Sequence, residues 1–131
     1  MIVADASAVL EILSRTSKGL ELERALLYRD LHAPHVIDLE VLNAVRRWER
    51  TSVIGPAQAT EILSMFLAIG ITRYPHTPLV DPRWALRHNL TPYDAAYLAL
   101  ADVLDAELVT MDSGLRKMAA RKNSRKPKLA E

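Results

Sequence analysis

Four acidic residues, far apart along the chain, occupy positions from which their side chains could act together. They are Asp5, Glu40, Asp94 and Asp112. Asp5 ends an apolar segment short enough to be a buried strand, and Asp112 follows a second such segment. Glu40 and Asp94 stand in the expected first turns of two helices. The carboxyl ends of parallel strands and the starts of the following helices share one edge of a sheet, so we expect these carboxylates to meet there.

The chemistry of such a group follows from its charge. Carboxylates held close together repel one another unless they are protonated or bound to cations. Oxygen ligands without histidine or cysteine suit Mg²⁺ or Mn²⁺. An ion of this kind can polarise a phosphoryl oxygen and generate hydroxide from water. The pattern therefore predicts hydrolysis of phosphodiester bonds.

Each acid also has a purely structural interpretation. Asp94 stands three residues after Thr91, as in a capping box, and Asp38 and Asp112 are natural helix N-caps. Glu40 in a first turn is favoured by the helix dipole. For any one of these residues, capping and metal binding are about equally supported. Capping does not explain Asp5, because an acid at the end of an apolar strand gains little without a cation nearby.

Strand and helix patterns alternate around these acids. Short apolar runs predict strands at 1–5, 33–37, 71–74 and 107–111. Helical patterns cover 6–14, 19–29, 38–50, 55–70, 82–89 and 91–104, and a last helix starts at Asp112. The helix from Thr91 is apolar almost all round and should be deeply buried. This order predicts an α/β fold, a three-layer α/β/α sandwich with a mainly parallel sheet of four to five strands.

Composition narrows the class of protein. The chain has 131 residues and no cysteine, which excludes a disulfide scaffold, a thiolate metal site and a cysteine nucleophile. The length fits one domain. No apolar run approaches the roughly 18–20 residues of a membrane span, and no secretory signal is readable. We therefore expect a cytoplasmic protein with no membrane partner.

The formal charge of +1 conceals an uneven distribution. Residues 1–115 carry a net charge of −5, and residues 116–131 carry +6. We predict one domain at 1–120, whose nuclease character rests on the acids above and on the family resemblance below, and a basic C-terminal tail at 121–131. The tail is equally explained as a solvated end or as a contact with RNA phosphates or with an acidic protein segment.

Four segments around the acids resemble the four motifs of the PIN-domain ribonucleases, and most closely the VapC toxins of bacterial and archaeal toxin–antitoxin pairs. They read IVADASA (2–8), APHVIDLEVLNAVRR (33–47), LTPYDAAYLALA (90–101) and LVTMD (108–112). The resemblance implies a Mg²⁺- or Mn²⁺-dependent endoribonuclease, usually dimeric, that a cognate VapB antitoxin inhibits. It also implies that the four acids form the metal site. Relatives commonly end in a short apolar strand, which residues 123–128 lack, so a fifth strand is not expected.

Several polar residues near the acids are candidates for supporting roles. Ser7 and Thr110 match hydroxyl positions beside two of the acids and could orient carboxylates or water. Asn43 follows Glu40 by one helical turn and is as easily explained by helix packing. Arg46 and Arg50 share a helix face, which could hold RNA phosphates or simply face solvent.

Other classes of function are less well supported by the residues. The pair His32 and His35 lacks a third metal ligand at suitable spacing, which favours a strand-entry or surface role. A phospho-accepting receiver domain would need a lysine near the last strand, and none lies between Lys18 and Lys117. No glycine-rich phosphate-binding loop is present. The main alternative is a PIN-like module that binds a protein partner without catalysis, although all four acids are in place.

Overall fold

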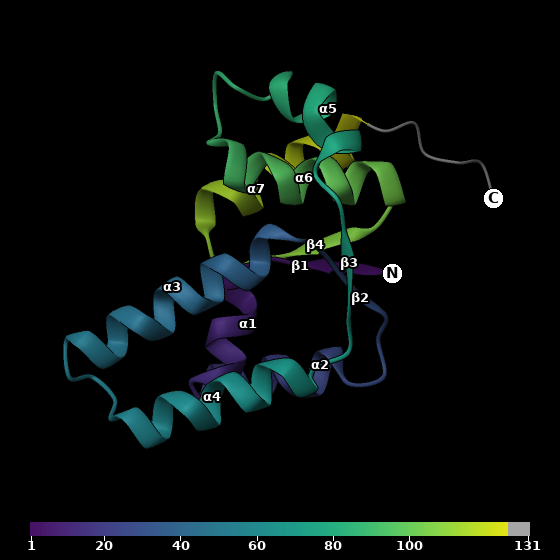
Figure 1. Ribbon diagram of the computed structural model, residues 1–131. Helices are drawn as coiled ribbons and strands as arrows, with labels where there is room; N and C mark the ends of the chain where they lie inside the picture. Colours follow the sequence, from purple (N-terminus) through teal and green to yellow (C-terminus); the bar gives the residue numbers. More distant parts are fainter. Residues whose placement is uncertain (126–131) are drawn as a thin grey trace.

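The protein is built on one parallel four-stranded sheet. The computed structural model describes residues 1–125, with side chains described through residue 121 (Figure 1). The strands are β1 (Ile2–Ala4), β2 (Leu31–Pro34), β3 (Ile71–Tyr74) and β4 (Glu107–Val109). They lie in the order β3-β2-β1-β4, and Val3 of β1 pairs with His32 on one side and Leu108 on the other. The carboxyl ends of the strands therefore share one edge, as predicted.

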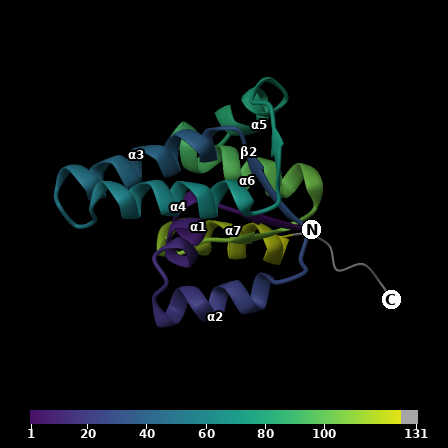
Figure 2. The ribbon, with the colours of Figure 1, turned by 60° about the horizontal axis from the view of Figure 1, so that its bottom comes forward.

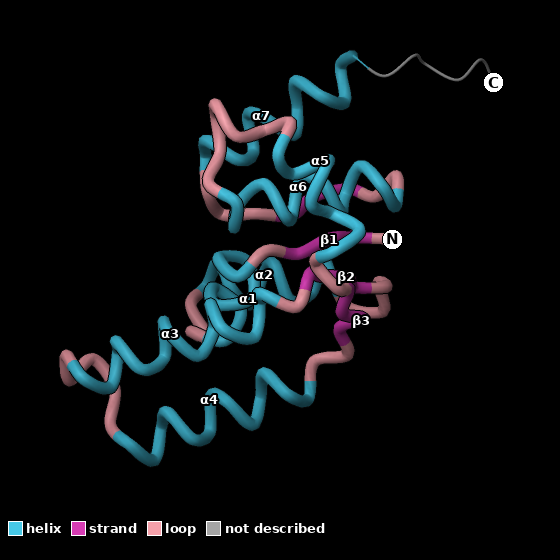
Figure 3. Tube along the Cα trace, turned by 45° about the horizontal axis from the view of Figure 1, so that its top comes forward, coloured by secondary structure: helices cyan, strands magenta, loops and turns pink. Residues whose placement is uncertain are grey.

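Helices cover both faces of this sheet. They are α1 (Ala6–Leu13), α2 (Ser17–Leu26), α3 (Val36–Arg50), α4 (Pro56–Ala68), the 3₁₀ turn η1 (Thr77–Leu79), α5 (Val80–Trp84), α6 (Pro92–Leu104) and α7 (Ser113–Arg125). Figures 1 and 3 place α5, α6 and α7 on one side of the strands, and α1, α3 and α4 on the other. The predicted α/β/α sandwich is confirmed, with four strands in the described residues.

Helices α3 and α4 pack together as an antiparallel pair that extends beyond the sheet (Figure 1). Gly55 caps α4 and Pro56 is its first residue, the predicted order, because a proline at this position loses no helical hydrogen bond. Figure 2 shows α2 on the far side of the molecule from α5. The outer ends of α3 and α4 lie away from the strands (Figure 1).

Helix α6 is the centre of the core. Every residue from Ala95 to Ala101 is buried, because this helix packs on β1 and β2 on one side and under α5 on the other. Thr91 caps it by accepting a hydrogen bond from the backbone N–H of Asp94 (3.2 Å). The predicted buried helix is confirmed, and its first turn is fixed at the strand edge.

Several predicted boundaries are wrong. The fourth strand ends at Val109 rather than at 111, and the helix expected at 19–29 spans Ser17–Leu26. The second strand ends at Pro34 rather than at residue 37, and α3 begins at Val36, so Asp38 lies within its first turn and is not its N-cap. A short buried apolar run does not distinguish a strand from a buried helical turn, which explains the error. Pro82 does not start a helix at 82–89 either. It is the third residue of the five-residue α5, and the chain from 85 to 90 forms turns.

The predicted domain boundary after residue 120 falls within α7, which continues to Arg125. Side chains from residue 122 and the whole of 126–131 lie outside the described residues. The basic tail at 121–131 therefore stays a prediction. In the part of the chain that is described, no helix has the length and apolar character needed to cross a membrane.

Candidate active site

Asp5 is a buried carboxylate held by three hydrogen-bond donors. It caps α1, and its Oδ1 accepts from the backbone N–H of Ala8 (3.0 Å) and from the hydroxyl of Ser7 (2.6 Å). Its Oδ2 accepts from the hydroxyl of Thr110 (2.5 Å). The side chain is only 4% exposed. Because burying a carboxylate is costly unless its oxygens are hydrogen-bonded, these donors are what allow an acid at this position.

The hydroxyls of Ser7 and Thr110 form a small network that links α1 to the end of β4. Ser7 Oγ accepts from the backbone N–H of Met111 (2.9 Å) while donating to Asp5. Thr110 Oγ1 accepts from the backbone N–H of Asp112 (3.0 Å) while donating to Asp5. Each hydroxyl therefore accepts a hydrogen bond from a backbone N–H and donates one to the Asp5 carboxylate. This is the geometry expected of the supporting role predicted for both residues.

Glu40 lies one turn into α3, where a residue of α6 orients it. The Tyr97 hydroxyl donates to Oε1 of Glu40 (2.5 Å). Burial raises the pKa of the Glu40 carboxyl, the bond from Tyr97 opposes this, and the charges of Asp94 and Asp5 raise it further. Three of the four predicted acids are therefore close enough to interact electrostatically.

Asp94 and Asp112 complete the group from two further elements. Burial raises the pKa of the Asp94 carboxyl, and the charges of Asp112 and Asp5 add to the effect. Asp112 is exposed and caps α7, because its Oδ1 accepts from the backbone N–H of Leu115 (2.8 Å). At Asp94 only the threonine half of the capping box forms. Among the described hydrogen bonds, none runs from the Thr91 backbone to the Asp94 carboxylate. Asp94 is therefore available for another role.

The chemistry of this donor set fits a hard divalent cation. All four side chains offer carboxylate oxygens. Burial raises the pKa of Glu40 and of Asp94, and the negative charges of the neighbouring acids raise both further, a repulsion that a bound cation relieves. Within the described residues, however, no three His, Asp or Glu side chains are grouped closely enough to hold one ion as they stand. The more accessible carboxylates, Asp94 and Asp112, would have to turn toward the fixed Asp5.

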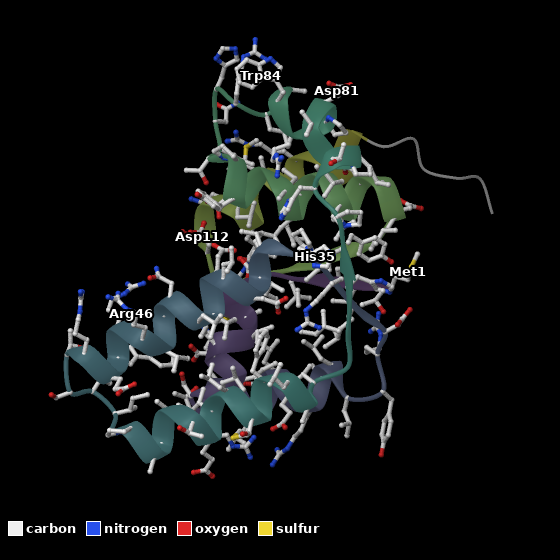
Figure 4. All side chains as sticks on the ribbon, in the orientation of Figure 1. Met1, His35, Arg46, Asp81, Trp84 and Asp112 are labelled. Carbon is white, nitrogen blue, oxygen red and sulfur yellow. The ribbon has the colours of Figure 1, made fainter. Side chains whose placement is uncertain are left out.

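The remaining predicted residues lie on the exposed face of α3. Asn43, Arg46 and Arg50 are all exposed, and no hydrogen bond between Asn43 and Glu40 occurs in the described part of the chain. Figure 4 shows Arg46 on the projecting length of α3, to one side of Asp112. The structure therefore brings Ser7 and Thr110 into hydrogen-bond contact with Asp5. The roles of Asn43, Arg46 and Arg50 stay predictions.

His32 has a structural role. Its ring is 5% exposed, with Nε2 bonded to Asp30 (2.8 Å) and Nδ1 to the Tyr74 hydroxyl (2.7 Å). Both ring nitrogens are occupied, so His32 is not placed to bind a metal, in agreement with the interpretation from spacing. His32 is in fact part of β2, and His35 is exposed at the start of α3.

Sequence reasoning missed Tyr97. A signal was available, because a tyrosine within a helix that is apolar on every side must find a partner for its buried hydroxyl. Tyr97 is 1% exposed, and Glu40 is that partner. Sequence reasoning also missed the ion pair between Arg73 and Asp38 (2.8 Å), which joins β3 to α3 and accounts for Asp38 without a metal.

Comparison with known proteins identifies this arrangement. The family model described as "PIN domain" matches residues 2–121. The chain is 42% identical to ribonuclease VapC1 of Mycobacterium tuberculosis over 115 residues, and 38% identical to ribonuclease VapC9 of the same species over 112 residues. Each match covers 86% of this chain and 86% of the relative. The chain belongs to the VapC ribonucleases of the PIN-domain family.

Solved structures place this VapC-family chain in the same fold. A crystal structure of Mycobacterium tuberculosis VapC20, titled a Sarcin–Ricin loop cleaving toxin, superposes with a TM-score of 0.66 at 13% identity, covering 90% of this chain and 95% of VapC20. A structure from Pyrobaculum aerophilum superposes with a TM-score of 0.64 at 22% identity, covering 95% and 90% of the two chains. At these identities the likeness concerns the fold alone. The predicted PIN-like architecture and the family resemblance are both confirmed.

Proposed function

We propose that this VapC-family protein is a Mg²⁺- or Mn²⁺-dependent endoribonuclease, the toxin of a type II toxin–antitoxin pair that a VapB antitoxin inhibits. The observation that carries the proposal is the convergence of Asp5, Glu40, Asp94 and Asp112 from four separate elements. The relatives named as VapC ribonucleases support the same reaction class. RNA is accordingly the proposed substrate, and a cytoplasmic homodimer the proposed working form.

Each acid has a distinct part in the proposed mechanism. Asp5 is the fixed reference point, because three donors leave its carboxylate little freedom to rotate. Asp94 and Asp112 would hold the cation together with Asp5. When bound, Mg²⁺ or Mn²⁺ would supply charge stabilisation at the phosphate and lower the pKa of water. Ser7 and Thr110 keep the Asp5 oxygens pointed toward the shared edge.

Glu40 is the residue best suited to move a proton. Its carboxyl has a raised pKa through burial and through the charges of Asp94 and Asp5, which makes it a stronger base than an ordinary glutamate. Tyr97 fixes Oε1, and no described hydrogen bond occupies Oε2. In the proposed reaction Oε2 of Glu40 accepts a proton from the attacking water.

The test compares acids inside and outside the group. Purified Asp5→Asn, Glu40→Gln and Asp94→Asn proteins should lose cleavage of a labelled single-stranded RNA in Mg²⁺ or Mn²⁺. Glu61→Gln, a matched change on the exposed face of α4, should retain it. Circular dichroism on each variant checks that the fold is intact. Full activity of the Asp5→Asn protein would refute the proposal.

A second measurement separates an enzyme from a binding module. Isothermal titration with Mn²⁺ should show binding to the wild type and to Glu61→Gln, and much weaker binding to Asp94→Asn. Mn²⁺ binding that is the same in all three proteins would mean that the acids do not hold the metal. No binding in any of them would favour a module that acts without catalysis.

A further inference from the structure

Two hollows lie beside the acidic group and meet at shared residues. The inner hollow, of about 260 Å³, is lined by Val36, His76, Arg83, Pro92, Tyr93 and Ala96. The outer hollow, of about 440 Å³, is lined by residues of α5 and of the turns that follow, and it shares Arg83 and Pro92 with the inner one. The two are therefore neighbours that share part of their walls, and we call them together the α5 groove.

The α5 groove begins next to the proposed catalytic acids. Val36 of the inner hollow stands one helical turn before Glu40, on the same side of α3. Tyr93 immediately precedes Asp94 at the start of α6, and the residue is 59% exposed. A polymer with one unit at the acids could therefore continue directly into the inner hollow.

The inner hollow presents a cationic donor group. Arg83 donates from Nη1 to Nδ1 of His76 (3.2 Å). Since a guanidinium can only donate, Nδ1 must be the unprotonated nitrogen, and a neutral ring then carries its proton on Nε2. Burial lowers the pKa of His76, with the charges of Arg83 and His35 acting in the same direction. Arg83 is thus held in place while most of its N–H groups stay available for an anion.

The outer hollow combines an aromatic ring with a second arginine. Trp84 is 65% exposed, and the guanidinium of Arg87 lies 4.7 Å from its ring centroid. Arg87 Nη1 also donates to the Trp84 backbone carbonyl (3.1 Å), which keeps the cation against the ring. Among the described residues, Asp81 is the one acid that lines this hollow, and Figure 4 places it apart from Trp84. The groove therefore carries more positive than negative charge.

We infer that the α5 groove binds the single-stranded stretch of RNA adjoining the cleaved phosphate, with Arg83 and Arg87 on phosphates and Trp84 stacked on a base. This inference rests on the proposed function, because it places a further stretch of the same RNA substrate on the protein. Positively charged grooves with exposed aromatic rings are the usual way in which proteins hold single strands, because every base offers a stacking face. A purely apolar interface would not need the two arginines.

The arginines of α3 are a weaker candidate for this role. Arg46, Arg47 and Arg50 are exposed, but Trp48 between them is half-buried and lines a separate hollow with Ile62 and Met65 of α4. Their face also extends away from the acids along the projecting helix pair, as Arg46 shows (Figure 4). The α5 groove instead has cations and an open aromatic ring together. Its inner hollow is lined by Tyr93, which immediately precedes Asp94 in the chain.

Tryptophan fluorescence gives a direct test of stacking. The chain has two tryptophans, so a Trp48→Phe protein reports on Trp84 alone. Titration in EDTA with an eight-nucleotide single-stranded RNA should quench this emission. An oligomer of the same length with abasic sites should bind through its phosphates with little quenching. Equal quenching by the two oligomers, or none by either, would overturn the stacking assignment.

Affinity measurements on variants test the arginines. By fluorescence anisotropy in EDTA, Trp84→Ala should weaken RNA binding roughly tenfold. The slope of log K against log salt should fall by about 0.7 for each of Arg83→Gln and Arg87→Gln. Arg24→Gln, which removes the same charge from exposed α2 on the far side of the molecule, should change neither.

The outcomes separate this inference from the proposed function. If the wild type cleaves RNA and the three groove variants bind and cleave as the wild type does, only the groove assignment fails. If the wild type neither binds nor cleaves RNA, the proposed function fails with it. If the groove variants keep their RNA affinity but change from dimer to monomer in sedimentation velocity, the groove is instead a contact with a second copy, and the inference is overturned.

Discussion

The hydroxyl of Tyr97 lies 2.5 Å from Oε1 of Glu40 and donates a hydrogen bond to it. Tyr97 comes from the most deeply buried helix, and Glu40 comes from a helix on the opposite side of the sheet edge. The bond therefore couples the packing of the core to the orientation of an acid that we propose to be catalytic. It also lowers the pKa of Glu40 against the larger effect of burial.

Removing this hydroxyl should change the pH dependence of cleavage. In Tyr97→Phe the carboxylate of Glu40 loses a donor, so its pKa should rise further and the acidic limb of the kcat/KM profile should move to higher pH. We expect kcat near neutral pH to fall by about tenfold, since a hydrogen bond to a charged group contributes about 1.5–3 kcal/mol. The measurement is a pH–rate profile for the wild type and the variant.

Tyr74→Phe is the matched control for this experiment. It also removes a hydroxyl from a hydrogen-bonded tyrosine, but its partner is the structural residue His32. Its stability should fall while its pH–rate profile keeps the wild-type shape. A profile that moves equally in both variants would show that Tyr97 acts through general stability and not through Glu40.

The hydroxyls around Asp5 should be needed for stability as well as activity. Thr110→Val keeps the shape of the side chain but leaves Oδ2 of Asp5 without its described donor. It also leaves the backbone N–H of Asp112 without its acceptor. We expect the free energy of unfolding to fall by about 1–3 kcal/mol, with a loss of cleavage, because a buried polar group left unpaired is costly.

Urea unfolding and an RNA cleavage assay check that prediction. Thr60→Val provides the comparison, since Thr60 is exposed on α4 and its hydroxyl donates only to the carbonyl of Pro56. It should leave both quantities near the wild-type values. A Thr110→Val protein as stable and as active as the wild type would mean that Ser7 and Ala8 suffice to position Asp5.

Residues with strong local patterns were predictable from the sequence. The limits of α6 and α4 follow from Thr91-Pro92 and Gly55-Pro56, because capping chemistry is a short-range property of the chain. The convergence of the four acids was also predictable, because parallel topology alone brings strand ends to one edge. Both predictions can be made without knowing which side chains are in contact in the folded protein.

Features that depend on pairing between distant residues were not predictable. Asp38 looked like a cap for α3, but Arg73, 35 residues away, pairs with it inside the first helical turn. Glu40 could be recognised as an acid at the edge, whereas its partner Tyr97 is 57 residues away and chosen by packing. The α5 groove likewise forms only where side chains of α5, of the turns after it and of the start of α6 come together.

Removing the negative charge of Asp38 should lower stability without changing cleavage, whereas removing that of Glu40 should abolish cleavage. Asp38→Asn breaks the ion pair with the partly buried Arg73, whose guanidinium also lies over the Phe66 ring (5.5 Å). We expect a loss of about 1 kcal/mol in stability and unchanged cleavage, because Asp38 is already paired and outside the acidic group. Thermal melts and cleavage rates for Asp38→Asn and Glu40→Gln test this. Loss of activity in both would place Asp38 among the functional acids.

The repulsion within the acidic group should be visible as pH-dependent stability. The pKa of Asp94 is raised in the folded protein by burial and by Asp112 and Asp5, so the folded state holds this proton more tightly than the unfolded state does. The unfolding free energy therefore decreases as pH rises from the ordinary pKa of an aspartate through the raised value, and it stays lower above that range.

Replacing Asp94 by asparagine should remove part of that penalty. In EDTA at neutral pH, Asp94→Asn should melt at a higher temperature than the wild type. The gain in unfolding free energy should be less than about 1 kcal/mol, because the Asp94 carboxyl is partly solvated. The difference should disappear at a pH below the ordinary pKa of an aspartate.

Adding Mn²⁺ should then raise the Tm of the wild type more than that of Asp94→Asn, because only the wild type has the full set of carboxylates. Differential scanning calorimetry at the two pH values, with and without Mn²⁺, gives all four comparisons. A wild type that is the more stable protein in EDTA at neutral pH would show that the four acids do not repel one another as their positions imply.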